Sequence, residues 1–526
     1  MSEDMADTVV SRAIVSEGED GPGSGRAASG GGTGRGRALD RASALVRTTW
    51  FLPALATAVL GLWRASSIEI WLDELTSVSV ASRSWSQILH TVRHVDAVHG
   101  AYYLFLHLWI TLFGHSLLVM RLPGVAAVTG AAICVALTGR RLFGDRAGFA
   151  AGAFFALTPA ISRYATELRS YPFVAFAAAL ATFLFVRALE NPSRRRWAGY
   201  AVALAAAGLL NLVAFTIVAG HVVGFVAYVY RNEEHWFLRA RRFVVATVLA
   251  TVAATPVVYY GMHQVQAQIG LAPKPTLHDV FTMGPQAVCS VLGAGILLAA
   301  GAAAWGDPRI RAVTLATATA LLPVAAIWVI SRVGSDSYFF FARYLLFCVP
   351  AWALLAGAGV AAIRSTRVVV AVLVVFGVCV VPDQQEVHTD FAHSWYNYPG
   401  LAFPPRDYRA AAQDVQRQYR PGDAGVFSNQ IDIDEGINFY LPADEQLRDL
   451  FQLETPAQVN NLFPVYCTDL QACLGDQGRV WMILPADLSD PFTGLLPSQQ
   501  PTMRRDYRVV SVDHVTGLTV ALLERG

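Results

Sequence analysis

Long apolar runs alternate with short charged loops between Thr48 and Pro382. A helix needs about 20 mostly apolar residues to cross a bilayer. The pattern therefore predicts eleven spans, near residues 49–68, 120–139, 147–162, 172–189, 198–212, 213–230, 243–260, 285–304, 312–331, 343–362 and 368–382. The stretch 198–230 is long enough for two helices that turn near Asn211. The expected fold class is a polytopic α-helical membrane protein.

Residues 101–116 are apolar as well, but they are too short to cross. Counting them as a span would invert every later loop. They are interpreted as an amphipathic helix at the outer interface, anchored by Tyr102, Tyr103 and Trp109.

The placement of arginines predicts the orientation of the spans. Basic clusters occur at every second turn, in the loops 140–146, 194–196, 231–242, 309–311 and 364–367. Cytoplasmic loops carry an excess of Lys and Arg. We therefore expect these loops and the N-terminal tail inside, and the other loops and the chain after Pro382 outside.

Composition divides the chain into three parts. Residues 1–47 are rich in Gly, Ser and Arg, which predicts a disordered cytoplasmic tail, and they lack the apolar run of a signal peptide. Residues 48–382 form the transmembrane part. Residues 383–526 are more polar and predict a small extracytoplasmic α/β domain. Its expected elements are a helix over 409–419, strands over 425–428 and 479–484, and a hairpin formed by 508–515 and 518–523.

Overall composition agrees with a membrane protein. The chain is 54% hydrophobic and only 15% charged, whereas soluble domains carry about 25% charged residues. A net charge of +1 gives no general attraction for nucleic acid. Nearly all basic residues are arginines, with Lys274 the single lysine, which together with abundant Ala, Gly and Val suggests a GC-rich bacterial genome. The expected location is therefore the bacterial plasma membrane.

The polar residues within and beyond the spans narrow the function. The predicted spans contain no Asp or Glu, whereas proton-coupled carriers usually need intramembrane carboxylates. His221 lies near the middle of its span and is interpreted as a histidine satisfied inside the bundle. Cys467 and Cys473 lie in the polar C-terminal part, where they form either a short disulfide or two free thiols.

Candidate chemistry gathers in the outer loops. Asp73 and Glu74 follow the first span, and Asp96 and His99 precede the interfacial helix. A carboxylate at the membrane surface can take a proton from a hydroxyl group. The competing interpretation is an acidic pair that is merely solvated.

Two further outer clusters combine arginines with aromatic residues. The second outer loop contains Arg163, Tyr164, Glu167, Arg169 and Tyr171. The third cluster is the run 338–344, which includes Arg343 and Tyr344. Guanidinium groups here could bind a lipid phosphate. The alternatives are pairing among helix-end charges in the loop and an arginine that snorkels at the interface.

The order of these motifs resembles a known superfamily. They are Trp-x-Asp-Glu (71–74), Asp…His before Tyr-Tyr (96–103), Phe-Gly-x-Ser…Arg-Leu-Pro (113–123), Gly-Arg-Arg-Leu-Phe-Gly (139–144), Arg-Tyr-x-x-Glu-x-Arg-x-Tyr (163–171) and Phe-x-Arg-Tyr-Leu (341–345). Over about residues 48–365 the chain resembles the GT-C superfamily of polyprenyl-phosphate-sugar glycosyltransferases. It looks closest to the branch with protein O-mannosyltransferases, lipid A aminoarabinose transferase and bacterial relatives of glycosyltransferase family 39.

The resemblance implies roles for residues. Asp73 would be the base that deprotonates the acceptor hydroxyl, and Glu74 would assist it or shape the pocket. Donor and acceptor contacts would come from Asp96, His99, Tyr102, Arg163, Glu167, Arg169, Tyr171, Arg343 and Tyr344. Many bacterial members have His-Pro-Pro before the interfacial helix, where this chain has His99-Gly100-Ala101. Some members use a divalent cation, but this sequence shows no clear ligand set, so the metal and any other cofactor stay open.

The resemblance also implies the reaction. A sugar, most plausibly mannose, would move from a polyprenyl-phosphate donor to an envelope glycan, a glycolipid or a protein by inverting displacement. The same fold with arabinose, galacturonic acid or aminoarabinose is the first alternative. A lipid or sugar transporter and an inactive scaffold are the others. The expected partners are the lipid donor, the acceptor and membrane lipids, without nucleic acid.

Overall fold

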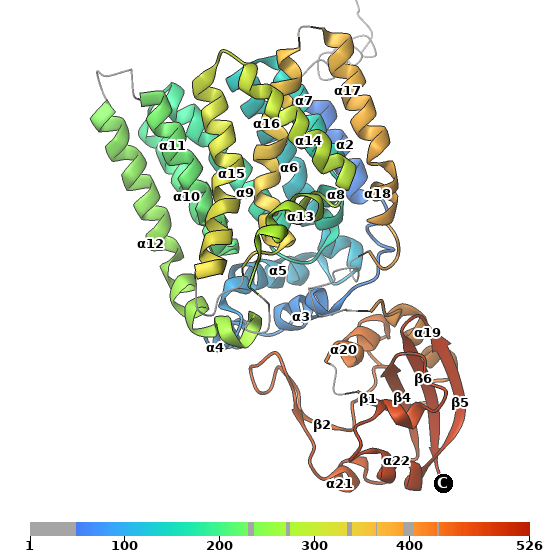
Figure 1. The fold of residues 1–526 in the computed structure, drawn as a ribbon. Coiled ribbons are helices and arrows are strands. Elements are labelled where there is room, and N and C mark those ends of the chain that lie inside the picture. The colour runs from blue at the N-terminus through green and yellow to red at the C-terminus, as the bar shows by residue number, and fades with distance from the viewer. Residues whose placement is uncertain are drawn as a thin grey trace, which may run out of the picture. The chain divides into compact units, whose positions relative to one another are not determined.

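The computed structural model describes residues 49–229, 236–269, 274–333, 339–363, 365–392, 404–428 and 431–526, without the side chains of 265–269 and 431. The predicted tail 1–47 and the aromatic residue Tyr338 lie outside the described residues. The described part is mostly helical (Figure 1), which confirms the predicted fold class. The described residues from 49 to 526 form one compact unit. The predicted boundary near Pro382 stays a prediction.

Among the described residues, six helices are long and apolar enough to cross a membrane. They are α6 (Leu117–Phe143), α9 (Tyr171–Glu190), η2 with α11 (Leu212–Thr216 and Ile217–Val229), α12 (Trp236–Ile269), α15 (Ile310–Val333), and η5 with α16 (Ala342–Cys348 and Val349–Ala362). A seventh candidate is the pair formed by α13 (Leu277–Val288) and α14 with η4 (Val291–Ala303 and Ala304–Gly306), which bends by 104° at its break.

The remaining predicted spans coincide with shorter helices. These are α2 (Phe51–Leu62), α7 (Asp145–Leu157) with α8 (Pro159–Thr166), α10 (Arg194–Leu210) and α17 (Thr366–Cys379), which is followed by α18 (Val381–Glu386). Pro159 separates α7 from α8, because proline is favoured at the start of a helix and disfavours a helical residue before it. Asn211 ends α10, so the predicted turn between two helices is confirmed. The count of eleven spans stays a prediction.

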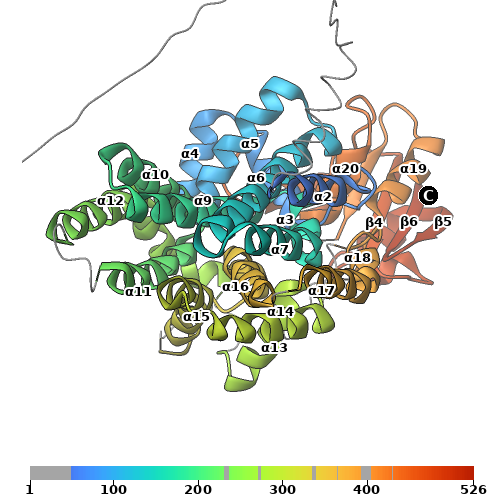
Figure 2. The ribbon, with the colours of Figure 1, turned by 90° about the horizontal axis from the view of Figure 1, so that it is seen from above.

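Small residues bring the central helices together. A Cβ atom on Gly148 of α7 would lie 2.5 Å from the Ala136 carbonyl oxygen of α6, and one on Gly357 of α16 would lie 2.5 Å from the Ala151 nitrogen of α7. Such positions tolerate only glycine, and small residues at contacts let membrane helices pack closely. Helices α6, α7 and α16 therefore form the middle of the bundle (Figure 2).

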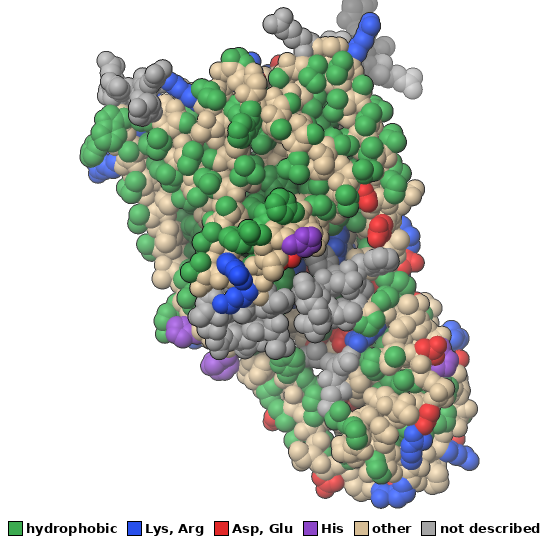
Figure 3. Space-filling model, viewed as in Figure 1, with side chains coloured by type: hydrophobic (Ala, Val, Ile, Leu, Met, Phe, Trp, Pro, Cys, Tyr) green, Lys and Arg blue, Asp and Glu red, His purple; other side chains and the backbone are tan. Residues whose placement is uncertain are grey.

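The surface of the bundle suits a lipid environment. Figure 3 shows hydrophobic side chains spread over the helices, whereas charged side chains gather toward the ends and on the C-terminal part. Helix α12, for example, exposes Val248, Leu249 and Val252 by 52%, 58% and 62%. Inside the bundle, His221 lies 3.0 Å from the Tyr200 hydroxyl and 3.2 Å from Thr182 Oγ1 and is fully buried. The interpretation of a satisfied core histidine is confirmed.

Short helices gather at one end of the bundle (Figure 1). They are α3 (Leu72–Ala81), α4 (Trp85–His94), η1 (Ala97–His99) and α5 (Gly100–Phe113). Helix α5 confirms the predicted short apolar helix: Tyr102 and Tyr103 are buried, and Leu112 and Phe113 are exposed.

The C-terminal part is an α/β unit. A four-stranded sheet has the order β1-β4-β6-β5, with β1 (Ala424–Phe427) parallel to β4 (Arg479–Pro485), and with β4 and β5 (Tyr507–Val515) antiparallel to β6 (Leu518–Arg525). Helices α19 (Tyr408–Gln418) and α20 (Ile431–Tyr440) lie beside the sheet in Figure 1. The predicted helix, strands and hairpin are thus confirmed. The smaller elements are β2 (Gln452–Glu454), β3 (Val465–Tyr466), α21 (Leu470–Leu474), η6 (Pro491–Gly494) and α22 (Gln500–Asp506).

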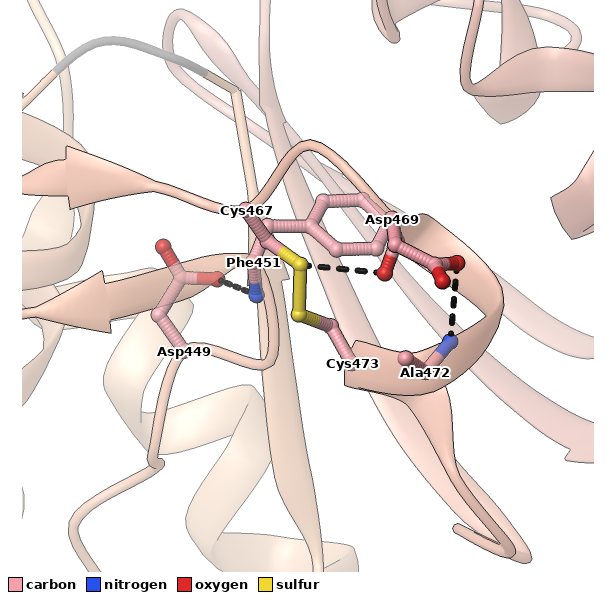
Figure 4. Close-up of a disulfide and its surroundings, with 6 residues drawn as sticks. All are labelled: Asp449, Phe451, Cys467, Asp469, Ala472 and Cys473. Atoms are coloured by element: carbon pink, nitrogen blue, oxygen red, sulfur yellow. Dashed lines mark hydrogen bonds between the residues drawn. A yellow bond between two sulfur atoms is a disulfide. The ribbon is translucent and has the colours of Figure 1, made fainter.

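Cys467 and Cys473 form a disulfide with their Cα atoms 6.6 Å apart (Figure 4). The Cys467 N–H donates to the Phe451 carbonyl, and the Phe451 N–H donates to Asp449 Oδ1. The sequence left open a short disulfide or two free thiols, and the structure contains the disulfide.

Candidate active site

Asp73 and Glu74 lie in the first turn of α3, after the N-cap residue Trp71. Negative side chains are favoured there because the helix dipole places positive charge at the N-terminus. Successive helical residues point about 100° apart, so the two carboxylates enter different surroundings. The Asp73 side chain stays 20% exposed, whereas the Glu74 side chain is fully buried.

Asp73 is held between two arginines from distant segments. Arg169, from the turn between α8 and α9, places Nη2 3.1 Å from Asp73 Oδ1. Arg343, from η5, places Nη1 2.7 Å from Asp73 Oδ2. The structure therefore brings together the three outer segments that the sequence singled out. Burial opposes ionisation of Asp73, but the attraction of Arg169 and then Arg343 outweighs it and lowers the pKa of this carboxyl.

Two tyrosines flank Arg343. Its guanidinium carbon lies 5.9 Å from the centre of the Tyr171 ring and 5.6 Å from the centre of the Tyr344 ring. A cation over an aromatic face is stabilised by the quadrupole of the ring. These residues, all predicted as binding residues, thus position Arg343 beside Asp73.

Glu74 forms a buried pair that the sequence analysis missed. Arg121 of α6 places Nη2 3.2 Å from Glu74 Oε1, and its Nη1 donates to the Ala65 and Ile68 carbonyls at 2.8 Å each. The Leu168 N–H also donates to Glu74 Oε1, at 2.9 Å. Both side chains are fully buried. Glu74 therefore joins α3 to α6 and to the turn that carries Arg169. The Arg-Leu-Pro motif was the signal for Arg121.

A second network connects Asp96 to the same arginine. His99 Nδ1 lies 2.6 Å from Asp96 Oδ1, and the Tyr103 hydroxyl donates to Asp96 Oδ2. Arg169 Nη1 in turn donates to the Tyr103 hydroxyl at 3.4 Å. Of the two predicted anchor tyrosines, Tyr103 belongs to this network. The ring of Tyr102 packs 5.8 Å from that of Phe173.

Glu167 is a buried carboxylate of a different kind. It is 3% exposed, and neither oxygen has a hydrogen-bond partner among the described residues. Burial raises the pKa of Glu167 to about 7, and nearby Arg163 only partly opposes this. Arg163 itself lies over the Tyr164 ring, 5.2 Å from its centre. Unpaired buried carboxylates are costly, and they are more frequent at functional sites.

Two apolar cavities lie among the helices. One, of about 470 Å³, reaches His99 and Tyr344 at the candidate site and continues along η2, α12 and α15 past Asn211 and Thr216. The other, of about 810 Å³, lies among α13–α16 and includes Trp305, Trp328 and Trp352. In the described part of the chain, no group of three or more His, Cys, Asp or Glu residues is placed to hold a metal ion.

Comparison with known proteins bears on the fold. Residues 101–260 match the family described as dolichyl-phosphate-mannose-protein mannosyltransferase. No curated protein matches the chain. Among solved structures, ArnT from Cupriavidus metallidurans bound to undecaprenyl phosphate is 15% identical with a TM-score of 0.57, over 90% of this chain and 98% of that chain. The apo state of the same protein is 13% identical with a TM-score of 0.56, over 90% of this chain and 97% of that chain.

A more distant similarity is to the oligosaccharyltransferase of Archaeoglobus fulgidus with zinc and sulfate, at 13% identity and a TM-score of 0.47, over 90% of this chain and 73% of that chain. The chain has the fold of the GT-C superfamily of glycosyltransferases, as its motifs predicted. The match to the mannosyltransferase family covers residues 101–260, less than half of the chain.

Proposed function

We propose that this protein is a membrane glycosyltransferase that uses a polyprenyl-phosphate-sugar donor, and that the sugar is mannose. The observation that carries the proposal is the carboxylate of Asp73 between the guanidinium groups of Arg169 and Arg343. The two carboxylate oxygens of Asp73 occupy the positions that we assign to phosphate oxygens. A planar carboxylate and a tetrahedral phosphate are both oxyanions, and a guanidinium binds either of them through paired N–H groups.

The donor phosphate would bind to Arg169 and Arg343 and displace Asp73 from them. With their charges neutralised by phosphate, the two arginines would no longer lower the pKa of Asp73. Its carboxylate would then become a stronger base at the moment when the donor is in place. The polyprenyl chain would occupy the apolar cavity of about 470 Å³ that begins at Tyr344. The undecaprenyl phosphate bound to ArnT supports this class of donor.

The reaction would be a single displacement at the anomeric carbon. The acceptor hydroxyl oxygen attacks that carbon and gives its proton to Asp73, while the bond from the carbon to the phosphate oxygen breaks. The arginines stabilise the charge on the departing phosphate. Attack opposite to the leaving group inverts the anomeric configuration. Glu74 acts as a positioning residue, because its oxygens are already bonded to Arg121 and Leu168.

The acceptor is proposed to be an envelope glycan, a glycolipid or a protein outside the bacterial plasma membrane. This requires the N-terminus inside and the C-terminal part outside, as the basic loops predict. The matched family supports mannose as the sugar. Arabinose, galacturonic acid and aminoarabinose are the competing sugars.

The experiment is a transfer assay with the purified full-length protein in lipid nanodiscs. Polyprenyl phosphates carrying mannose, arabinose, galacturonic acid or aminoarabinose are each offered with an envelope extract from a strain that lacks the protein. We expect transfer from the mannose donor, release of polyprenyl phosphate and inversion by NMR. Transfer from another donor alone would overturn mannose. Absence of transfer from all four would overturn the proposed function.

A further inference from the structure

We propose that His99 is a catalytic residue, a general acid whose Nε2 proton goes to the phosphate oxygen that leaves the sugar. The inference rests on the proposed function and adds a second proton transfer to it.

Asp96 fixes the orientation of the ring. The distance of 2.6 Å between His99 Nδ1 and Asp96 Oδ1 is that of a charge-assisted hydrogen bond. Asp96 is 5% exposed, and its second oxygen accepts the Tyr103 hydroxyl. A buried carboxylate on Nδ1 places that proton on Nδ1 and stabilises the imidazolium, as in hydrolase triads. Asp96 is thus a positioning residue.

His99 also lines a cavity. Within the described part of the chain, Nε2 of His99 has no hydrogen-bond partner, and the side chain is 14% exposed. His99 and Tyr344 both line the cavity of about 470 Å³ that would hold the lipid. Tyr344 also flanks Arg343, one of the two arginines proposed to bind phosphate. His99 therefore lies at the end of the cavity where the lipid is proposed to join its phosphate.

The groups around His99 come from several elements. Asp96 and Tyr103 belong to its own network, Arg169 reaches that network through Tyr103, and the charge of His99 also acts on Asp73. Helices α4, α5, α10 and α12 pack against the turn that carries His99. His90, Arg93 and His94 of α4 and His263 of α12 are exposed, and His107 of α5 bonds to the Ala81 carbonyl. The arginines of α10 and α12 lie near the N-terminal ends of those helices. Among the described residues, the charged groups that act on the imidazole and its network include Asp96, Asp73 and Arg169.

The step balances in atoms and charge. A bond forms between the acceptor oxygen and the anomeric carbon, and the bond from that carbon to the phosphate oxygen breaks. The acceptor proton moves to Asp73, and the Nε2 proton moves to the phosphate oxygen. The products are the glycoside, protonated polyprenyl phosphate, neutral His99 and protonated Asp73. A proton passed from Asp73 to His99 through water restores the site.

The rival role for His99 is a third cation that binds phosphate without giving up a proton. Two variants separate the roles. His99→Arg keeps a positive charge and N–H donors but cannot release a proton, and His99→Gln keeps size and polarity. His94→Gln is the matched control, because His94 is an exposed histidine whose Nδ1 bonds to the His90 carbonyl.

The measurement is kcat and donor KM across the neutral pH range, in nanodiscs, with folding checked by thermal unfolding and by binding of polyprenyl phosphate. Histidine is the side chain that ordinarily changes charge in this range. We expect kcat of the parent and of His94→Gln to fall on the alkaline side. We expect His99→Gln and His99→Arg to lower kcat by about 10²-fold, to change KM little and to lose the alkaline fall. Recovery of kcat in His99→Arg, or an unchanged pH profile in His99→Gln, would overturn the proposal.

Asp96→Asn provides the second variant if the His99 variants do not fold. Loss of the carboxylate destabilises the imidazolium, so the alkaline fall should move to lower pH. An unmoved fall would overturn the proposal. The proposed function and the role of His99 are tested separately. If the parent transfers no sugar, the proposed function is refuted. The role of His99 is refuted only by the results above in a parent that is active.

Discussion

The buried pair of Glu74 and Arg121 gives a sharp test of how the site is built. Glu74→Gln keeps the shape of the side chain and an oxygen that can accept the Leu168 N–H, but it removes the charge opposite Arg121. The guanidinium of Arg121 would keep the Ala65 and Ile68 carbonyls and a neutral amide oxygen as partners, but its buried charge would have no opposite charge. Breaking one side of a buried ion pair costs about 3–5 kcal/mol.

The lower end of that range applies here. Two carbonyls already share the guanidinium of Arg121. Burial raises the pKa of Glu74 although Arg121 opposes the rise. We therefore expect a loss of roughly 3 kcal/mol in the free energy of unfolding. Because Glu74 fastens the turn that carries Arg169, donor binding should weaken as well.

The assay is thermal unfolding in detergent, followed by tryptophan fluorescence, together with polyprenyl phosphate binding at a temperature where the variant is folded. Glu454→Gln is the control, since Glu454 is exposed on β2 and surface changes stay within about 0.5 kcal/mol. Glu74→Gln should melt clearly below both the parent and this control. A melting temperature and phosphate affinity equal to those of the parent would refute the buried-pair argument.

Three other outcomes follow from the same structure. Arg169→Lys and Arg343→Lys should each weaken donor binding despite the retained charge, because lysine cannot form the paired hydrogen bonds of a guanidinium. An unchanged donor KM in both variants would show that the two arginines only anchor the protein at the interface. Burial raises the pKa of Glu167 from 4.5 to about 7, so its contribution to stability is complete below pH 4.5 and is lost as pH rises through 7, by roughly 3 kcal/mol. Glu167→Gln should flatten this pH dependence of the free energy of unfolding. An unaltered pH dependence would contradict the burial argument. A phosphatase fused after Pro382 should be active, because the basic loops place this part outside; an inactive fusion beside an active cytoplasmic reporter would reverse the orientation.

The sequence predicted most residues of the site, but not the ion pairs and hydrogen bonds that join them. Asp73, Arg169 and Arg343 were each singled out, but their spacing in the chain could not show that one carboxylate bridges both arginines. Arg121 was visible only as part of a motif, because an arginine next to an apolar run is usually a helix-end charge. Tyr103 was predicted as an interface anchor, and only the fold shows its bond to Asp96.

Helix breaks were the hardest features to predict. Apolar composition continues through the bend between α13 and α14, where Cys289 adopts a left-handed conformation with φ of 55°. A hydropathy pattern cannot detect such a break. In the C-terminal part, the alternating strands were predicted, whereas α20 was missed because its sequence, Ile-Asp-Ile-Asp-Glu-Gly, has no helical apolar period. The pairing of Cys467 with Cys473 depends on a distance that the sequence does not contain.

The most direct test of the proposed mechanism is Asp73→Asn, measured for both donor binding and transfer. The side chain of Asn cannot take a proton at neutral pH, and a positioned base contributes about 10²–10⁴-fold. The change also removes the carboxylate that competes with phosphate for Arg169 and Arg343. We expect polyprenyl phosphate to bind at least as tightly as to the parent, while sugar transfer falls by at least about a hundredfold. Transfer near the parental rate with a matched lipid donor would contradict the role of Asp73 as the base.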